Sequence, residues 1–163
     1  MVRTSAIAML TRLPKKQETI YSIRKALKDS SYMVKANALE SLYEIDQEFA
    51  IKKAGHFEYS NNGSLVNSIG KIYALEGNVS DSSFFRSKMK SFVVNKIYLQ
   101  RSYAAYLEQQ KEDDVRSAVE QFKEISDNPH YSDKDRKVMA NICIDLIINY
   151  HERIARMEKF IRD

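Results

Sequence analysis

Residues 2–10, VRTSAIAML, have a counterpart 32 residues later in residues 34–42, VKANALESL. The matched pairs are Val2 with Val34, Arg3 with Lys35, Ala6 with Ala38, and Leu10 with Leu42. In both copies the apolar positions fall at i, i+4, i+5 and i+8, which places them on one face of a helix. The small alanine leaves room for a neighbouring helix to come close. The sequence therefore predicts a helix that recurs as part of a packed unit.

A second amphipathic segment, residues 18–27, lies between the two copies, so each unit is a helix, a short turn and another helix. Asp29 or Ser30 is expected to cap the helix that follows. After another amphipathic run at residues 49–54, a third unit begins, and its helix at 64–75 is expected to stop at Gly77-Asn78. In this copy the alanine position holds Ile69 or Gly70, depending on the register.

Beyond residue 80 the pattern stays helical while the 32-residue spacing fades. Helices are expected from residue 84 onward, after a cap at 81–83, and then at 92–109, 115–125 and 134–161. Residues 126–133 are expected to form a loop that ends in a cap for the last helix. We count about nine helices and no strand. The prediction is one all-α domain over residues 1–163, an α/α superhelix of antiparallel helix pairs, with regular repeats at 1–78 and irregular helices at 79–163.

The composition agrees with a helical protein. The 163 residues suffice for one domain with a core, and 4 Gly and 2 Pro are few for a β-barrel or a Rossmann unit. The net charge of +4 makes the chain mildly basic, which does not by itself indicate a polyanionic partner. One Cys excludes a disulfide framework within the chain and a zinc site built from cysteines.

No run of residues approaches the roughly 20 apolar residues that span a bilayer, and the first residues lack the pattern of a signal peptide. We therefore do not expect the membrane as a partner, and the compartment is left open. Residues 2–13 already have the pattern of an amphipathic helix with no cap before it. This opening predicts that the chain is a piece of a longer protein.

The two copies at 2–10 and 34–42, the second preceded by Asp29, resemble the HEAT-repeat pattern of an aspartate, then Val-Arg or Val-Lys, then Ala and Leu at helical steps. The repeat is shorter than the about 40–47 residues usual for HEAT units, so the chain looks like a short HEAT-like subclass. The resemblance implies stacked antiparallel helix pairs.

A narrower resemblance rests on ALKDSSYMV at 26–34, IGKIYALEGN at 69–78 and the long irregular helices after Phe84. Together they are similar to the C-terminal helical region of bacterial zinc aminopeptidases of the aminopeptidase N family. The resemblance implies a non-catalytic domain that covers a catalytic domain of the same polypeptide and shapes the access of peptide substrates. Zinc would then lie in that parent domain and not in this chain.

That family's zinc pattern, His-Glu-x-x-His, is only half present here. His151-Glu152 is followed by Ala155 where the second histidine would stand, and we interpret the pair as solvated helix surface. The family's Gly-x-Met-Glu-Asn segment is also missing. His56 and His130 lie in loop-like contexts with no Asp or Cys at ligand spacing. We therefore expect no catalytic, cofactor-binding or metal-binding residue, and no enzyme activity of the chain by itself.

Other polar residues on the last helix have simple structural explanations. Cys143 lies in an apolar run and is expected to be a buried core thiol. Asp145 is expected on the outer face, near Asn141 or Arg153. A basic stripe recurs every three residues, and interleaved acidic residues favour a solvated face over a phosphate-binding one. The stripe consists of Arg153, Arg156, Lys159 and Arg162.

Four aromatic residues, Phe92, Tyr98, Tyr103 and Tyr106, do not share one helical stripe. They are expected to pack between helices and not to stack on bases. The leading functional interpretation is the non-catalytic aminopeptidase domain. The alternative is a free-standing HEAT-like scaffold that binds a protein partner through its curved face. A nucleic-acid-binding HEAT-like protein stands third.

Overall fold

The computed structural model describes residues 2–13, 17–90 and 96–162, and the side chains at 79, 90, 96–97 and 153–162 lie outside this description. These ranges contain nine α-helices, one short 3-10 helix and no strand. The prediction of an all-α protein with about nine helices is confirmed. No helix in the described ranges is both long enough and apolar enough to cross a membrane.

The helices follow one another with short connections. Their bounds are α1 (Val2–Leu10), α2 (Gln17–Ala26), α3 (Tyr32–Ile45), α4 (Gln47–Phe57), α5 (Gly63–Glu76), α6 (Ser82–Lys90), α7 (Lys96–Leu107), α8 (Glu112–Asp127) and α9 (Asp133–Arg162), with the 3-10 helix η1 (Val79–Asp81) before α6.

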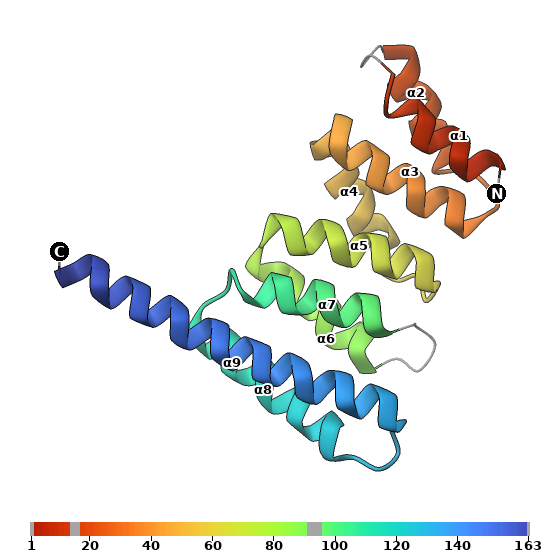
Figure 1. Cartoon of the computed structure of the whole chain (residues 1–163). Coiled ribbons are helices and arrows are strands. Elements are labelled where there is room, and N and C mark those ends of the chain that lie inside the picture. Colours follow the sequence, from red (N-terminus) through yellow and green to blue (C-terminus); the bar gives the residue numbers. More distant parts are fainter. Residues whose placement is uncertain (1, 14–16, 91–95, 163) are drawn as a thin grey trace.

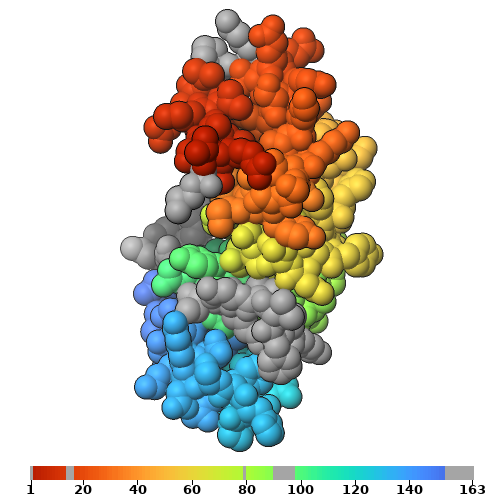
Figure 2. All heavy atoms as spheres, turned by 90° about the vertical axis from the view of Figure 1, so that its right-hand side faces the viewer, coloured from red at the N-terminus to blue at the C-terminus, as the bar shows by residue number. Residues whose placement is uncertain are grey.

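The odd-numbered helices form one continuous layer. Contacts join α1 to α3, α3 to α5, α5 to α7 and α7 to α9, while α2, α4, α6 and α8 each pack against their odd-numbered neighbours. The result is an elongated stack with α1 and α2 at one end and α8 and α9 at the other, and the C-terminal part of α9 projects beyond it (Figure 1). The space-filling view from the side shows the same order from the N-terminal to the C-terminal end (Figure 2).

The stacking of helices continues past the point where the sequence repeat fades. The helices α3 and α5 begin at residues 32 and 63, which are 31 residues apart, and α7 and α9 extend the same layer. Because the N-caps of α3 and α5 are Ser31 and Asn62, the residue of α5 that corresponds to Ala38 is Ile69. Gly70 instead lies where α7 comes close to α5, since a Cβ there would be 3.0 Å from Leu99 Cδ1.

The end of α5 agrees with the prediction from the sequence, whereas the start of α3 differs from it. Gly77 ends α5 with φ of 64°, and its N–H donates to the Tyr73 carbonyl, as predicted. The predicted cap of α3 at Asp29 or Ser30 is wrong, because Ser31 is the N-cap. Asp29 Oδ1 accepts the Ser31 N–H at 2.8 Å and pairs with Arg3 at 3.4 Å, so Asp29 braces the turn before the helix.

Near the C-terminus the predicted loop is shorter, because α8 extends to Asp127 and leaves residues 128–132 between the helices. The sequence predicts a cap at the end of this loop, and Ser132 forms it. Its Oγ accepts the Asp135 N–H at 3.2 Å and donates to the Asp135 carboxylate at 2.7 Å.

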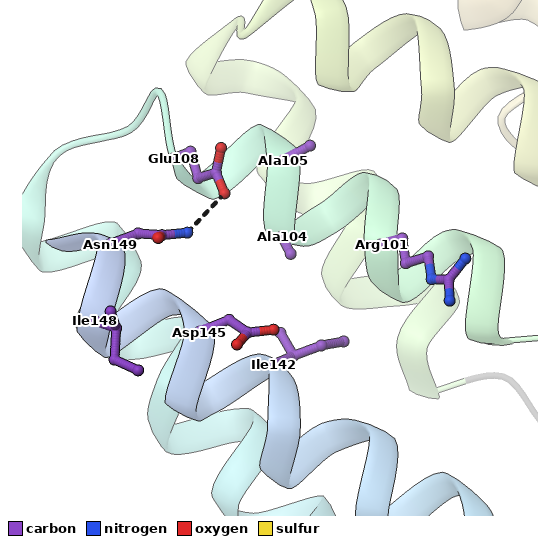
Figure 3. A pocket seen from close by; sticks show the side chains of 8 residues that line it. All are labelled: Arg101, Ala104, Ala105, Glu108, Ile142, Asp145, Ile148 and Asn149. Carbon is purple, nitrogen blue, oxygen red and sulfur yellow. Dashed lines mark hydrogen bonds between the residues drawn. The ribbon is translucent and has the colours of Figure 1, made fainter.

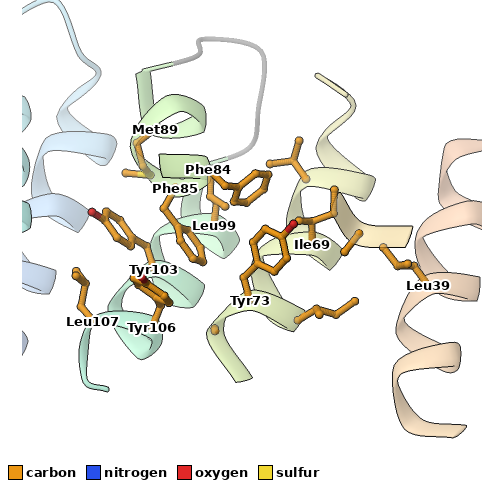
Figure 4. Close-up of a cluster of buried hydrophobic side chains, with 14 of the residues drawn as sticks. Leu39, Ile69, Tyr73, Phe84, Phe85, Met89, Leu99, Tyr103, Tyr106 and Leu107 are labelled. Atoms are coloured by element: carbon orange, nitrogen blue, oxygen red, sulfur yellow. The ribbon is translucent and has the colours of Figure 1, made fainter. Parts of the chain in front are cut away.

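The core changes character along the stack. Around α3 and α4 it contains small and aliphatic residues, among them Ala36, Ala38, Ala50 and Ala54, all buried. Around α5, α6 and α7 it is aromatic (Figure 4). Phe85 stacks on Tyr103 with ring centroids 4.9 Å apart, and Tyr106, Tyr73 and Phe84 complete the cluster.

Candidate functional site

A groove of about 290 Å³ lies between α7 and α9 (Figure 3). Its walls come from two segments about forty residues apart in the sequence. The lining residues are Arg101, Ala104, Ala105 and Glu108 from α7, and Ile142, Asp145, Ile148 and Asn149 from α9.

The local sequence explains why the groove stays open. Arg101, Ala105 and Glu108 are spaced i, i+4 and i+7, so they share one face of α7. Alanine is too short to fill the space between two helices, and the branched side chains of Ile142 and Ile148 form the opposite wall (Figure 3). Arg101 and Ile142 lie at one end and Glu108 and Asn149 at the other, so α7 and α9 run parallel.

The polar groups divide into a bonded and an unbonded set. Asn149 Nδ2 donates to Glu108 Oε1 at 3.1 Å and fastens one end of the groove. Arg101 and Asp145 are exposed, and no hydrogen bond or ion pair holds either within the described side chains. Asp145 therefore lies on the outer face, as predicted. The groove offers one cation, Arg101, two carboxylates, of which Asn149 holds Glu108, and an apolar wall.

Large apolar side chains are exposed on α7 and α9, and among them Ile148 lines this groove, whereas Ile147 lines a second groove between α8 and α9. Ile144, Ile147 and Ile148 on α9 are 54%, 46% and 50% exposed, and Tyr98 on α7 is 56% exposed. Tyr98 lies two turns before Ala105, on the same side of α7. The prediction that Tyr98 packs between helices is wrong. Tyr103 and Tyr106 are buried as predicted, and Phe92 lies outside the described residues.

The half-motif His151-Glu152 borders the second groove, of about 280 Å³, between α8 and α9. His151 and Glu152 are both exposed, and the His151 ring lies 6.2 Å from the Tyr150 ring. Within the described residues, no group of three or more His, Cys, Asp or Glu side chains is placed to hold a metal ion. The pair lies on helix surface, and we assign it no zinc.

The other two histidines lie far from both grooves. The prediction that His56 lies in a loop is wrong. His56 lies in the last turn of α4, where its Nδ1 is 2.7 Å from the Lys52 carbonyl oxygen. His130 does lie in a loop, and its backbone N–H donates to Asn128 Oδ1 at 2.9 Å. Neither faces a metal-ligand set.

Cys143 is half-buried, which corrects the prediction of full burial. Its Sγ lies 3.7 Å from the Val119 carbonyl oxygen on α8. Burial raises the pKa of the thiol, so less of it is thiolate near neutral pH than in a free cysteine. The side chains of the basic stripe, Arg153, Arg156, Lys159 and Arg162, lie outside the described residues, and its interpretation stays a prediction.

Sequence reasoning missed the α7 half of the groove. The available signal was the 101–105–108 spacing of charged and small residues on one helical face, which is unusual for a helix in a packed layer. The sequence also contains no signal for a second polar cluster, which consists of Tyr73 and Glu76 of α5 with Glu58 and Asp81. There the Tyr73 hydroxyl donates to Glu58, and burial raises the pKa of Asp81 to about 6, with Glu58 and Glu76 adding to the shift.

Comparison with protein-family models, with curated proteins and with solved structures found no match to this chain. The HEAT-like and aminopeptidase N-like resemblances therefore stay predictions from the sequence. What the structure defines is a class, a two-layer stack of helix pairs in which the odd-numbered helices form a continuous layer.

Proposed function

We propose that this chain is a non-catalytic helical domain of an aminopeptidase N-like zinc metallopeptidase, which covers the catalytic domain and shapes the access of peptides. The zinc and the reacting groups would lie in the catalytic domain, and no residue of this chain is assigned to them. The chain would contribute a surface that packs on the catalytic domain and borders the path of the peptide.

The exposed apolar side chains beside the α7–α9 groove carry this proposal. Ile148 lines the groove that holds Arg101 and Asp145, and Tyr98 is exposed on the same α7 helix, whereas Ile147 lines the neighbouring groove between α8 and α9. A patch of large apolar side chains with polar groups beside it is typical of a surface that packs on another folded body. The opposite charges in the groove can also interact with the backbone ends or side chains of a peptide.

The two sequence segments behind the family resemblance support the proposal in a second way. Residues 26–34 form the turn that carries α2 into α3, and residues 69–78 form the second half of α5 with its Gly77 stop. Both segments therefore shape the junctions on which the stacking of helix pairs depends.

The first test is the reading frame that encodes this chain. We expect a His-Glu-x-x-His helix in the same polypeptide, and a complete natural polypeptide without that motif would overturn the proposal. The second test uses that polypeptide with Ile148→Glu. We expect a higher KM for long peptides and an unchanged kcat for a single-residue chromogenic amide.

The matched control for this test is Lys123→Glu, which places the same carboxylate on the exposed side of α8. We expect the control to behave like the unsubstituted protein with both substrates. Equal KM values for long peptides in both variants would show that the α7–α9 surface does not border the peptide path.

A second candidate function is a free-standing scaffold that binds a segment of a protein partner, and the α7–α9 groove favours it. An extended segment with two opposite charges followed by an apolar side chain would match Arg101, Asp145 and Ile148, which lie in this order along the groove (Figure 3). The test is affinity capture with the unsubstituted chain and with Asp145→Arg. A partner retained by the first and lost by the second supports a scaffold, and a partner retained equally by both contradicts this groove as its site.

A further inference from the structure

A continuous stripe of apolar side chains is exposed to solvent on the outer side of α1. Val2 is 83% exposed, Met9 is 68% exposed, and Leu13, in the turn that follows the helix, is 52% exposed. Ala6 is exposed between them. Val2, Ala6 and Met9 are spaced i, i+4 and i+7, so they follow one side of the helix, and Leu13 comes next in the turn beyond its end. Single exposed apolar residues are ordinary, whereas a stripe of this length indicates an interaction surface.

The internal repeat supplies a comparison for every residue of the stripe. The counterparts 32 residues later in α3 are Val34, Ala38, Ser41 and Ile45. Val34 is 4% exposed, Ala38 is fully buried, Ser41 is 8% exposed, and Ile45 is half-buried. The same positions of the same repeat are therefore covered in α3 and bare in α1.

The cover over α3 on this side is the preceding helix pair. Both α1 and α2 pack on α3, and Ile45 lines a groove together with Ile20 and Tyr21 of α2. The other side of α3 faces α5, because Glu40 accepts hydrogen bonds from Ser68 and Lys71 there. Residues 34, 41 and 45 lie roughly opposite Glu40 around the helix, so α1 and α2 cover them.

The next unit has the same arrangement. Because α5 begins 31 residues after α3, its corresponding residues are Leu65, Ile69, Ile72 and Glu76. Leu65, Ile69 and Ile72 are at most 1% exposed, and Glu76 is half-buried, with α3 and α4 packed on the preceding side of α5. A preceding helix pair thus covers this position in α3 and in α5.

We propose that the stripe Val2, Ala6, Met9 and Leu13 is a docking face for a further helix pair of the same repeat, packed on α1 as α1 and α2 pack on α3. The partner is an amphipathic helical hairpin that presents aliphatic and small side chains, as α1 and α2 present Ile7, Ile23 and Leu27 to α3. Such a pair would extend the continuous layer of odd-numbered helices by one member.

The test adds such a pair to the full chain. A second copy of residues 2–33 is placed directly before Val2, so that Met33 of the copy leads into Val2 as Met33 leads into Val34. The probe is a single thiol in the original α1, Met9→Cys in a Cys143→Ser background. Its control is Arg12→Cys in the same background, because Arg12 is exposed and its counterpart in α3, Glu44, is exposed as well.

We expect the thiol at position 9 to react at least about tenfold more slowly in the extended chain than in the original one, because a folded cover must open before the reagent enters. The thiol at position 12 is expected to react equally fast in both. An added copy that stays unhelical by circular dichroism, or a thiol at position 9 with an unchanged rate, would overturn the proposal.

The other occupant of the stripe that must be distinguished is a second copy of the chain. Light scattering of the original chain across a range of concentrations, with and without Met9→Glu, measures whether the chain dimerises through the stripe. A dimer that Met9→Glu dissociates would show that the stripe serves self-association and would also overturn the proposal. A monomer in both cases agrees with a face reserved for a helix pair.

Discussion

The two halves of the stack keep the same architecture with different side chains. Around α3 and α4 the helices meet over buried alanines such as Ala38 and Ala54, whereas around α6 and α7 the space is filled by rings such as Phe85 and Tyr103. A contact over alanine tolerates little change in side-chain size. A cluster of rings can fill the space between helices in several arrangements. The same stacking of helices is therefore held by different side chains in the two halves, and it continues where the 32-residue sequence pattern fades.

Removing a ring should have the largest effect. We expect Phe85→Ala to lower the free energy of unfolding by about 3–5 kcal/mol, because it removes a fully buried ring and leaves a cavity beside Tyr103. Urea denaturation followed by circular dichroism measures it. Tyr98→Ala, which shortens an exposed ring on α7, is the control and should change the stability by less than about 0.5 kcal/mol. Equal losses in both variants would contradict the aromatic core.

Enlarging an alanine tests the half of the stack around α3 and α4. We expect Ala38→Leu to lower the free energy of unfolding by about 1–3 kcal/mol, because Ala38 is fully buried and a larger side chain must displace its neighbours. The repeat offers a matched control, since Ala6 occupies the corresponding position and is exposed. Ala6→Leu should be within about 0.5 kcal/mol of the unsubstituted chain. Thermal unfolding of the two variants side by side would reveal whether the small residue is required only where a helix covers it.

Substitution of two glycines is expected to change the free energy of unfolding by a smaller amount. Gly77 has φ of 64°, and a Cβ there would meet the Gln109 side chain that donates to the Ala74 carbonyl. Gly77→Ala should therefore cost about 1–2 kcal/mol of unfolding free energy. Gly55, inside α4, has space for a Cβ, and Gly55→Ala should be neutral or stabilise by up to about 1 kcal/mol. A stabilising Gly77→Ala in denaturant titrations would contradict the left-handed end of α5.

The smallest expected effect is a pH dependence from Asp81. Burial, with Glu58 and Glu76 nearby, raises the pKa of Asp81 in the folded protein from its usual 3.8 to about 6. Between these values the folded state binds the proton more tightly than the unfolded state does, so ionisation at higher pH favours unfolding. We expect the contribution of Asp81 to stability to fall as the pH rises from about 4 to about 6 and to stay constant above that range.

Melting curves of Asp81→Asn and the unsubstituted chain from pH 4 to pH 7 measure this effect. The variant should lose less of its Tm across the interval than the unsubstituted chain does. Asp113→Asn, in the exposed first turn of α8, is the control for altering a surface aspartate. Parallel profiles for Asp81→Asn and the unsubstituted chain would contradict the raised pKa.

The parts of this structure that could be read from the sequence are those set within one helix or one turn. The buried face of α3 follows from apolar spacing, and the end of α5 follows from Gly77, whereas in α1 only Ile7 of the equally spaced apolar residues is buried. The α7–α9 groove could not be read in this way. It forms where Ala104 and Ala105 meet Ile148 about forty residues later, and the sequence contains no signal for which two helices of an irregular stack lie side by side.

The aromatic residues show the same limit. Tyr98 and Tyr106 are similar residues on one helix, yet one is mostly exposed and the other is fully buried. Only the position of α5, α6 and α9 around α7 distinguishes them. The half-burial of Cys143 depends likewise on the distance to α8, as does its contact with the Val119 carbonyl.

The single-file order of α1, α3, α5, α7 and α9 has a consequence for motion. Each of these helices packs on the helices next to it in the stack, so the molecule can open progressively from its ends inward. Amide hydrogens of α5 would then exchange most slowly, and those of α1 and the projecting part of α9 most rapidly. A partner that fastened one end would slow exchange first in the adjoining helices and least at the far end, so the pattern of protection would reveal where on the stack it binds.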